Sequence, residues 1–232
     1  MNDSDKNIFD DEDLLRVYDR ILPLAKHYQS ILAIHLRALE HCDNVIDLGC
    51  GTGNLAIELL KAGKSVTGVD NSLLSLNVLQ RKANHLSLSD KLTLVHGDVT
   101  SLLRFPDAGF DGASSMIIAH LLDNPEAHFR ESHRILNHGG CFVLTARGSV
   151  PQDCLAEVVR SQILAKDDSG SLRDDCDYLC NKLLLTAKLR AKHLFMASEI
   201  AKYLDAVGYV GIESLHNDSE NVMVSLQASK HK

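Results

Sequence analysis

The pattern of apolar and polar residues predicts two amphipathic helices at the start of the chain. Between Glu12 and His41, apolar side chains recur three or four residues apart, which is the spacing of one helical face. Pro23 interrupts this pattern, and a proline inside a helix removes a backbone hydrogen bond and clashes with the preceding turn. We therefore expect one helix before Pro23 and a second after it.

From Asn44 onward, short apolar runs alternate with segments of helical periodicity. The runs predict strands over Asn44–Leu48, Ser65–Val69, Leu92–His96, Phe110–Ile118 and Cys141–Ala146. Helices are expected over Asn54–Lys61, Leu73–His85 and from Pro125 to about Leu136. Asn124 is a suitable N-cap for the last of these helices, and Asn137–Gly140 is expected to break it. Such alternation, with nearly continuous apolar strands, is typical of a parallel sheet covered on both faces, a doubly wound α/β fold.

The pattern changes after Arg147. A mostly helical region follows, with a polar break at Lys166–Ser171, and then a helix over Ser198–Ala206 that Gly208 ends. Tyr209–Leu215 and Asn221–Leu226 are expected to form an antiparallel hairpin, which makes the sheet mixed and seven-stranded. At 232 residues one domain is expected. Its predicted parts are an N-terminal helical cap (1–43), a ligand-binding core (44–147), a helical lid after the fifth strand (148–193), and a C-terminal helix with the hairpin (194–232).

Composition narrows the possible partners. Hydrophobic residues make up 45% and charged residues 24% of the chain, which is ordinary for a globular protein. A net charge of -7 without any basic run argues against nucleic acid as the main partner. The amino terminus lacks the basic and apolar regions of a signal peptide, and the longest apolar runs are far below the ~20 residues that span a bilayer. We expect a cytoplasmic protein without a membrane partner.

The six cysteines do not suggest a metal site. Cys50 and Cys141 fall in apolar surroundings and are expected to be buried free thiols. Cys176 and Cys180 share one helical face, but no second Cys/His pair at ligand spacing accompanies them. Two thiols on a helix face are therefore favoured over a zinc site.

A glycine-rich turn follows the first predicted strand, in the sequence V-I-D-L-G-C-G-T-G-N from Val45 to Asn54. Glycines between a strand and a helix let the backbone approach a ligand closely, so a cofactor site is expected here. A dinucleotide fingerprint needs its third glycine where Asn54 stands, which disfavours NAD and FAD. A phosphate-binding loop ending at Gly63-Lys64-Ser65 fails as well, because Glu58 occupies its first glycine position.

These residues resemble the class I S-adenosylmethionine (SAM)-dependent methyltransferases of the small-molecule type. Their first motif is a strand ending in acidic-x-G-x-G-x-G, which Asp47 to Gly53 match. Phe110–His120 is similar to the family's fourth strand, and Arg134–Gly140 to its R-V-L-K-P-G-G turn, with Asn137-His138 in place of Lys-Pro. The motifs cover about residues 44 to 147. The resemblance implies a Rossmann-like fold, SAM as cofactor, and transfer of its methyl group to a small molecule.

The resemblance also implies roles for individual residues. Gly49 and Gly51 would lie beneath the methionine and ribose parts of SAM, while Asp47 accepts from its ammonium group and Asp70 from both ribose hydroxyls. Asp98 would accept from the adenine amino group, with a neighbouring backbone N–H holding the ring. The whole predicted cofactor set is Tyr28, Asp47, Gly49, Cys50, Gly51, Asp70, Asn71, Asp98, Val99, Ser115 and Met116. Tyr18 and Tyr28 are equally compatible with a place over the cofactor and with the core.

His120 is the candidate catalytic base. It follows the fourth strand at the expected mouth of the site, and an imidazole suits removal of a proton from a hydroxyl or ammonium acceptor. A histidine packed over the cofactor with only a structural role is the alternative. Several charged and aromatic residues in or beside the predicted lid are candidates for contacts with the acceptor, and the sequence does not choose among them: Arg147, Arg173, Tyr178, Arg190 and His193.

The residues at the end of the fourth strand limit the class of molecule that can accept the methyl group. Ser114-Ser115-Met116 stands where base-methylating enzymes carry [DN]-P-P-[YFW], and no Pro-Cys nucleophile is present. We expect an oxygen or nitrogen nucleophile on a small molecule. Three other functions stay open: a SAM-using enzyme that cyclises or decarboxylates, a protein methyltransferase, and a noncatalytic SAM-binding subunit of a larger complex.

Overall fold

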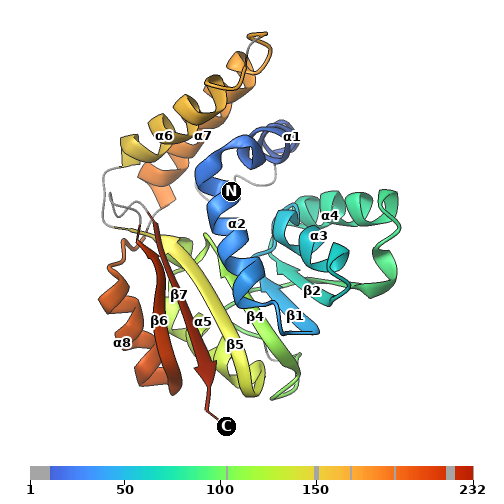
Figure 1. Ribbon diagram of the computed structural model, residues 1–232, viewed down its shortest axis with the longest axis vertical. Coiled ribbons are helices and arrows are strands. Elements are labelled where there is room, and N and C mark those ends of the chain that lie inside the picture. The colour runs from blue at the N-terminus through green and yellow to red at the C-terminus, as the bar shows by residue number, and fades with distance from the viewer. Residues whose placement is uncertain are drawn as a thin grey trace, which may run out of the picture.

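A seven-stranded sheet organises the computed structural model of the chain (Figure 1). The structure describes residues 11–102, 104–148, 152–167, 169–190, 192–217 and 223–231, with only the backbone at 152–155, 183–190 and 216–217. The strands are β1 (Asn44–Leu48), β2 (Ser65–Asp70), β3 (Leu92–His96), β4 (Phe110–Met116), β5 (Leu136–Arg147), β6 (Tyr209–Asn217) and β7 (Met223–Lys230).

The strand order is β3-β2-β1-β4-β5-β7-β6. Strands β1 to β5 pair in parallel, while β7 is antiparallel to both β5 and β6. The predicted mixed sheet of seven strands is confirmed. Parallel strands bring their carboxyl ends to one edge of the sheet. Strands β2 and β3 lie on one side of β1, and β4 and β5 on the other, so the strand order switches sides between β1 and β4, which is where such folds bind ligands.

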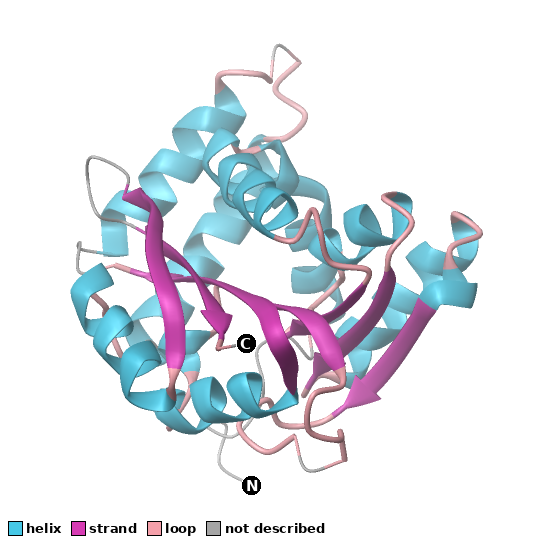
Figure 2. Cartoon of the chain, turned by 60° about the horizontal axis from the view of Figure 1, so that its bottom comes forward, coloured by secondary structure: helices cyan, strands magenta, loops and turns pink. Residues whose placement is uncertain are grey.

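Helices cover both faces of this sheet (Figure 2). They are α1 (Glu12–Ile21), α2 (Lys26–Ala38), α3 (Asn54–Lys61), α4 (Leu73–His85), α5 (Pro125–Ile135), α6 (Gln152–Leu164), α7 (Arg173–Arg190) and α8 (Ala197–Val207). Phe129 and Ile200, from α5 and α8, pack in one apolar core on one face. Leu39, which follows α2, and Leu55 of α3 pack in a second core on the other face. Burial of these apolar side chains is the main source of stability for such a layered fold.

Helices α6 and α7 form an antiparallel pair above the carboxyl edge of the sheet and pack against α1 (Figure 1). Their shared core joins Leu14 and Ile21 of α1 with Ile163 of α6 and Leu179 of α7. At the rim of this contact, the guanidinium of Arg20 lies 3.1 Å from the carboxylate of Asp175. The predicted N-terminal cap and predicted lid therefore meet in one helical layer.

Two predicted boundaries were wrong. Asn137–Gly140 does not break the chain between helix and strand, because β5 already begins at Leu136. Its pairing with β4 shifts register between Phe110 and Gly112, so the glycines accommodate a β-bulge. Strand β4 ends at Met116, not at Ile118, because Ile117 adopts a positive φ of 65°. The turn of the C-terminal hairpin lies partly outside the described residues, at 218–222.

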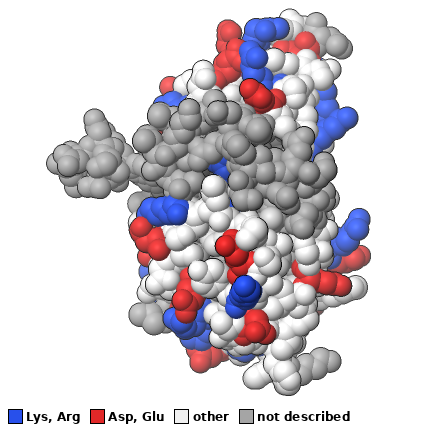
Figure 3. Space-filling view, turned by 90° about the vertical axis from the view of Figure 1, so that its left-hand side faces the viewer, with Lys and Arg blue, Asp and Glu red and all other residues white. Residues whose placement is uncertain are grey.

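Charge is dispersed over the face formed by α8 and β6. Acidic and basic side chains alternate there, with no large field of either sign among the coloured residues (Figure 3). Within the part of the chain that is described, no helix has both the length and the apolar character required to cross a membrane.

Candidate active site

A cavity of about 650 Å³ opens at the carboxyl edge of the sheet. Its floor is formed by the turns after β1, β2, β3 and β4, and its cover includes Leu15 and Tyr18 of α1 and Tyr28 of α2. Cavities of this size usually hold small molecules. The predicted cofactor residues that line it are Tyr28, Gly49, Cys50, Gly51, Asp70, Asn71, Asp98, Val99 and Met116.

The glycine turn forms the central part of the floor. The N–H groups of Gly49 and Cys50 both donate to the carbonyl of Val69 on β2, at 2.8 and 3.1 Å. Gly49 has a φ of +74°, and a Cβ there would lie 2.6 Å from the Ile118 side chain, so only glycine fits. A Cβ on Gly51 would meet no atom within 4 Å. The backbone at Gly51 thus faces open space that a ligand can fill.

Asp70 holds the glycine turn from the end of β2. One carboxylate oxygen accepts from the backbone N–H of Gly51 at 2.8 Å, and the other from the N–H of Ser72 at 2.9 Å. The carboxylate also lines the cavity. Because each oxygen can accept more than one hydrogen bond, it retains capacity toward a ligand.

The loop after β3 forms the opposite wall. The carboxylate of Asp98 accepts from both the N–H and the hydroxyl of Thr100 at 2.8 Å, which fixes its orientation. Behind the wall, the buried ring of His128 contacts the carbonyl of Val99 at 3.1 Å and the hydroxyl of Ser115 at 2.8 Å. Since the carbonyl can only accept, Nδ1 of His128 donates to it and Nε2 accepts from Ser115.

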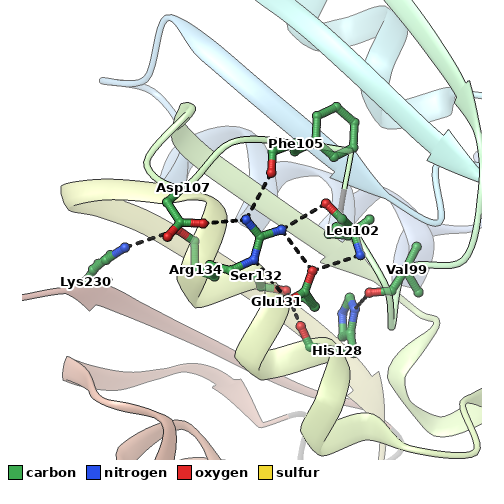
Figure 4. A network of polar contacts seen from close by, with 9 residues as sticks. All are labelled: Val99, Leu102, Phe105, Asp107, His128, Glu131, Ser132, Arg134 and Lys230. Carbon is green, nitrogen blue, oxygen red and sulfur yellow. Dashed lines mark hydrogen bonds and ion pairs between the residues drawn. The ribbon is translucent and has the colours of Figure 1, made fainter.

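Arg134 anchors the same loop to α5 (Figure 4). Its guanidinium donates to the carbonyls of Leu102 and Phe105 at 2.9 and 3.0 Å. It also pairs with the carboxylates of Glu131 and Asp107 at 3.0 and 2.6 Å. These two hydrogen-bonding carboxylates raise the pKa of Arg134, so it stays charged. The arginine of the R-I-L-N-H-G-G segment thus fixes the loop that carries Asp98 and Val99.

Two predicted cofactor residues lie below the cavity surface. Asp47 is 2% exposed, and burial raises the pKa of its carboxyl to about 7, although hydrogen bonding by the Ser114 hydroxyl lowers it in part. The described residues include no Lys, Arg or His side chain in an ion pair with Asp47. Ser115 is fully buried against His128 and does not line the cavity.

His120, the candidate base, lies in the short helical turn at Ala119–Leu121. Its neighbours Leu121 and Leu122 line the cavity, but its own ring does not. The ring is buried, and Nδ1 has no hydrogen-bond partner among the described residues. Burial, and then the charge of Arg147, lower the pKa of His120 to about 3, so the ring is neutral at physiological pH.

Other lining residues could not be predicted from the motifs. Ile117 is a β-branched residue in the left-handed region, a conformation that typically costs about 1 to 3 kcal/mol and tends to occur at functional sites. Its N–H donates to the carbonyl of Thr145 at 2.8 Å, which holds the bend. Lys192 and Asp123 form an ion pair, and both line the cavity. No sequence signal marked these three positions.

A polar cluster joins the N-terminal helices to the glycine turn. The carboxylate of Asp19 accepts from the Thr52 hydroxyl at 2.8 Å and from the Lys82 ammonium at 2.7 Å. Lys82 also donates to the side chain of Asn54, whose amide donates to the Tyr28 hydroxyl at 3.2 Å. Asn54, which disfavoured a dinucleotide site, thus ties α2 to the start of α3.

The cysteines are free thiols in the part of the chain where they are described. Cys50 is buried, as expected, whereas Cys141 is only half-buried. Cys176 and Cys180 pack in the core shared by α1, α6 and α7. Among the described residues, no three His, Cys, Asp or Glu side chains are grouped so that they could hold a metal ion.

Known proteins show the same domain and fold. A family model described as a methyltransferase domain matches residues 46–144. The chain is 27% identical over 159 residues to a probable cobalt-precorrin-6B C(15)-methyltransferase (decarboxylating) of Saccharolobus solfataricus, covering 66% of this chain and 73% of that protein. Alignments with five further curated relatives span only 19% to 40% of their lengths.

Solved structures extend the likeness to the whole fold. A putative SAM-dependent methyltransferase of Methanococcus maripaludis superimposes with a TM-score of 0.66 at 20% identity, covering 100% of this chain and 98% of the other. A second structure is phosphoethanolamine N-methyltransferase 2 of Haemonchus contortus, solved with phosphomonomethylethanolamine and S-adenosylhomocysteine. It superimposes with a TM-score of 0.69 at 16% identity, covering 96% of this chain and 59% of the other. Residues 46–144 of the chain thus match a methyltransferase domain, and the chain as a whole has the fold of these two solved structures.

Proposed function

We propose that this enzyme methylates an oxygen or nitrogen nucleophile on a small molecule that enters the cavity beside SAM. The observation that carries the proposal is the mixed lining of the cavity. The glycine turn, Asp70 and Asp98 line it together with apolar side chains, among them Leu15 of α1 and Met116 and Leu122. A concave cavity of about 650 Å³ suits small molecules better than a macromolecular surface.

The residues present fit the cofactor. We assign Asp70 to the ribose hydroxyls, because it lines the cavity beside the open space over Gly51. Asp98 and the Val99 backbone are assigned to the adenine ring, and Asp47 to the ammonium group, since its buried carboxylate has no cationic partner among the described residues. When bound, SAM supplies an electrophilic methyl group on a sulfonium. The chain must then hold the nucleophile in line with that methyl and exclude water.

The chemistry is testable without knowing the acceptor. SAM and S-adenosylhomocysteine should raise the melting temperature, and NAD should not, because Asn54 replaces the glycine that dinucleotides require. Incubation of the protein with labelled SAM and a fractionated metabolite extract should then give labelled product and S-adenosylhomocysteine. Release of methylthioadenosine would indicate another SAM reaction, and stabilisation by NAD alone would contradict the cofactor assignment.

We propose that His120 is the base that removes a proton from the acceptor. One property of its ring favours this role and another opposes it. Its neutral ring can take a proton at Nδ1, which has no hydrogen-bond partner among the described residues, whereas a pKa near 3 makes it a weak base. His120→Ala should lower turnover by up to about 100-fold and leave SAM affinity unchanged. The loss should shrink at high pH, where the acceptor ionises by itself.

The matched control for this substitution is His133→Ala, which removes a half-buried ring of α5 that packs against Tyr209 and does not line the cavity. It should leave turnover at the wild-type level. A negligible loss in His120→Ala, or one of the same size at every pH, would leave His120 a packing residue.

A further inference from the structure

An arginine is buried at the carboxyl end of β5 without a counter-ion. Arg147, the last residue of this strand, is only 4% exposed. Among the described residues, no carboxylate forms an ion pair with its guanidinium, and its Nε has no hydrogen-bond partner. A charge away from water is costly unless an opposite charge or hydrogen bonds compensate it. The described part of the chain therefore leaves the charge of Arg147 for another molecule to neutralise.

Two other cations show how this chain compensates such charges. Lys64, the second buried cation among the described residues, donates to two backbone carbonyls at 2.8 and 2.6 Å. Lys192, which lines the cavity, pairs with Asp123. Arg147 differs from both, because burial lowers its pKa and no described carboxylate raises it.

Arg147 lies beside the wall of the cavity, on the side of the sheet that α2 covers. The N–H of Ile117 donates to the carbonyl of Thr145 at 2.8 Å. Arg147 follows two residues later on β5, at the height of the turn that carries Ile117 and Ile118, and both isoleucines line the cavity. The hydroxyl of Thr145 contacts His35 of α2. Because side chains two residues apart on a strand share a face, Arg147 projects toward the same side.

A second buried group without a partner lies near Arg147. Nδ1 of His120 has no hydrogen-bond partner among the described residues, and the charge of Arg147 is, after burial, the second cause that lowers the pKa of this ring. The segment after α7 holds the backbone of both residues. The N–H groups of Lys192 and His193 donate to the carbonyl of His120 at 2.9 and 3.3 Å, and that of Phe195 to the carbonyl of Arg147 at 3.0 Å. The backbone is thus fixed, while the two side chains still lack partners.

Charge balance and the lining favour a carboxylate as the missing partner. One guanidinium neutralises a single negative charge and can donate to both oxygens of a carboxylate at once. A phosphate monoester carries about 1.5 to 2 negative charges at pH 7, and the nearby Lys192 is already paired. The cavity wall beside Arg147 is apolar, since it is formed by Ile117, Ile118 and Leu121.

We propose that the methyl acceptor carries a carboxylate, separate from its nucleophile, that inserts beside Ile117 and binds the guanidinium of Arg147. This inference rests on the proposed transfer of a methyl group to a small molecule in the cavity. Arg147 sets the specificity for the acceptor and takes no part in bond making. The methyl group goes to the oxygen or nitrogen nucleophile, so the product keeps the negative charge of its carboxylate.

The charge of the product tests the proposal. The protein is incubated with methyl-labelled SAM and a metabolite extract, and the mixture is passed over an anion-exchange resin at pH 7. Unreacted SAM is a cation and passes through, whereas the labelled product should be retained. A labelled product that passes through, as a methyl ester would, overturns the carboxylate. Retention that alkaline phosphatase abolishes would indicate a phosphate ester and overturn it as well.

Substitutions then test Arg147 itself. Arg147→Met keeps the length of the side chain but removes the guanidinium. At limiting acceptor its initial rate should fall by about 100-fold, while the Kd of S-adenosylhomocysteine stays within about twofold of wild type. Arg147→Lys keeps the charge without the planar fork and should recover part of the rate. The matched control is Arg130→Met, which removes an exposed guanidinium of α5 that pairs with Glu126, and it should react as wild type does.

Stability without ligand separates a binding role from a structural one. Replacing a buried charge that has no partner by an apolar side chain is often neutral or stabilising. The melting temperature of ligand-free Arg147→Met should therefore equal or exceed that of wild type. A fall of more than about 4 °C would show that the chain itself compensates Arg147, and would overturn the proposal whether or not a product is found. A labelled product without negative charge leaves methyl transfer intact, whereas no labelled product in any fraction, from protein that binds SAM, contradicts the proposed function itself.

Discussion

Asp70→Ala is expected to weaken SAM binding by about 2 to 4 kcal/mol, which is roughly 30- to 1,000-fold in Kd. Two effects add in this variant. It removes the charged acceptor proposed for both ribose hydroxyls, and it removes the acceptors for the N–H groups of Gly51 and Ser72 that shape the turn. The loss should therefore be larger than that of a ligand contact alone. Calorimetry with S-adenosylhomocysteine on folded protein measures it.

Two further variants separate these effects. Asp70→Asn keeps one carbonyl acceptor but no charge, so its affinity should fall between wild type and Asp70→Ala. Asp90→Ala removes an exposed carboxylate in the short turn before β3 and should bind as wild type does. A loss smaller than about threefold in Asp70→Ala would rule out the proposed ribose contact.

The parts of the site that sequence could predict are local in the chain. The glycine turn directly follows β1, and its spacing disfavoured a dinucleotide site. The positions of Asp70 and Asp98 were predictable because Asp70 ends β2 and Asp98 comes two residues after β3, and both strands have a clear apolar run. The doubly wound arrangement with parallel strands followed from the alternation of strands and helices, since parallel strands require covered crossovers. Strand ends were less predictable, because the bulge in β5 depends on its pairing with β4.

The remaining features depend on contacts between segments far apart in the sequence. Asn54 meets Tyr28 and Lys82 only after α2, α3 and α4 are packed together. His35 looked like one more residue of an amphipathic helix, and nothing in its neighbours indicates that it contacts β4 and β5. His120 illustrates the opposite case, because its position after β4 was predictable but the burial of its ring was not. Periodicity places a residue on a face of an element, and it does not identify what packs against that face.

The folded protein should lose stability steeply in mild acid. Three buried histidines, His35, His120 and His128, have their pKa values lowered by burial to about 3, 3 and 4. Unfolding exposes them to water, where each takes up a proton below about pH 6.5. The unfolded chain then binds more protons than the folded one, so stability falls as the pH falls through this window.

Asp47 changes the free energy of unfolding in the opposite direction to the histidines. The net pH dependence of this free energy is the sum of the two contributions. Its pKa of about 7 in the folded state means that between about pH 4 and 6.5 it binds a proton that the unfolded chain does not. On unfolding, the three histidines take up about three protons and Asp47 releases about one, so the unfolded chain binds about two more protons than the folded chain. The free energy of unfolding then changes by roughly 3 kcal/mol per pH unit. The free energy of unfolding should therefore drop by about 5 kcal/mol from pH 6.5 to 4.5, as measured by urea denaturation.

His128→Gln tests this origin of the acid sensitivity. A glutamine cannot take up a proton, so the slope should fall by about 1.4 kcal/mol per pH unit relative to wild type, even if the variant is less stable at neutral pH. His85→Gln is the matched control, because His85 is exposed at the end of α4 and its ring is in water in both states. Equal slopes in His128→Gln and His85→Gln would mean that the buried imidazoles do not drive acid unfolding. A slope that flattens only in His128→Gln would show that neutral buried rings set the lower pH limit of this fold, the same property that lets the ring of His35 stay neutral beside Ser114.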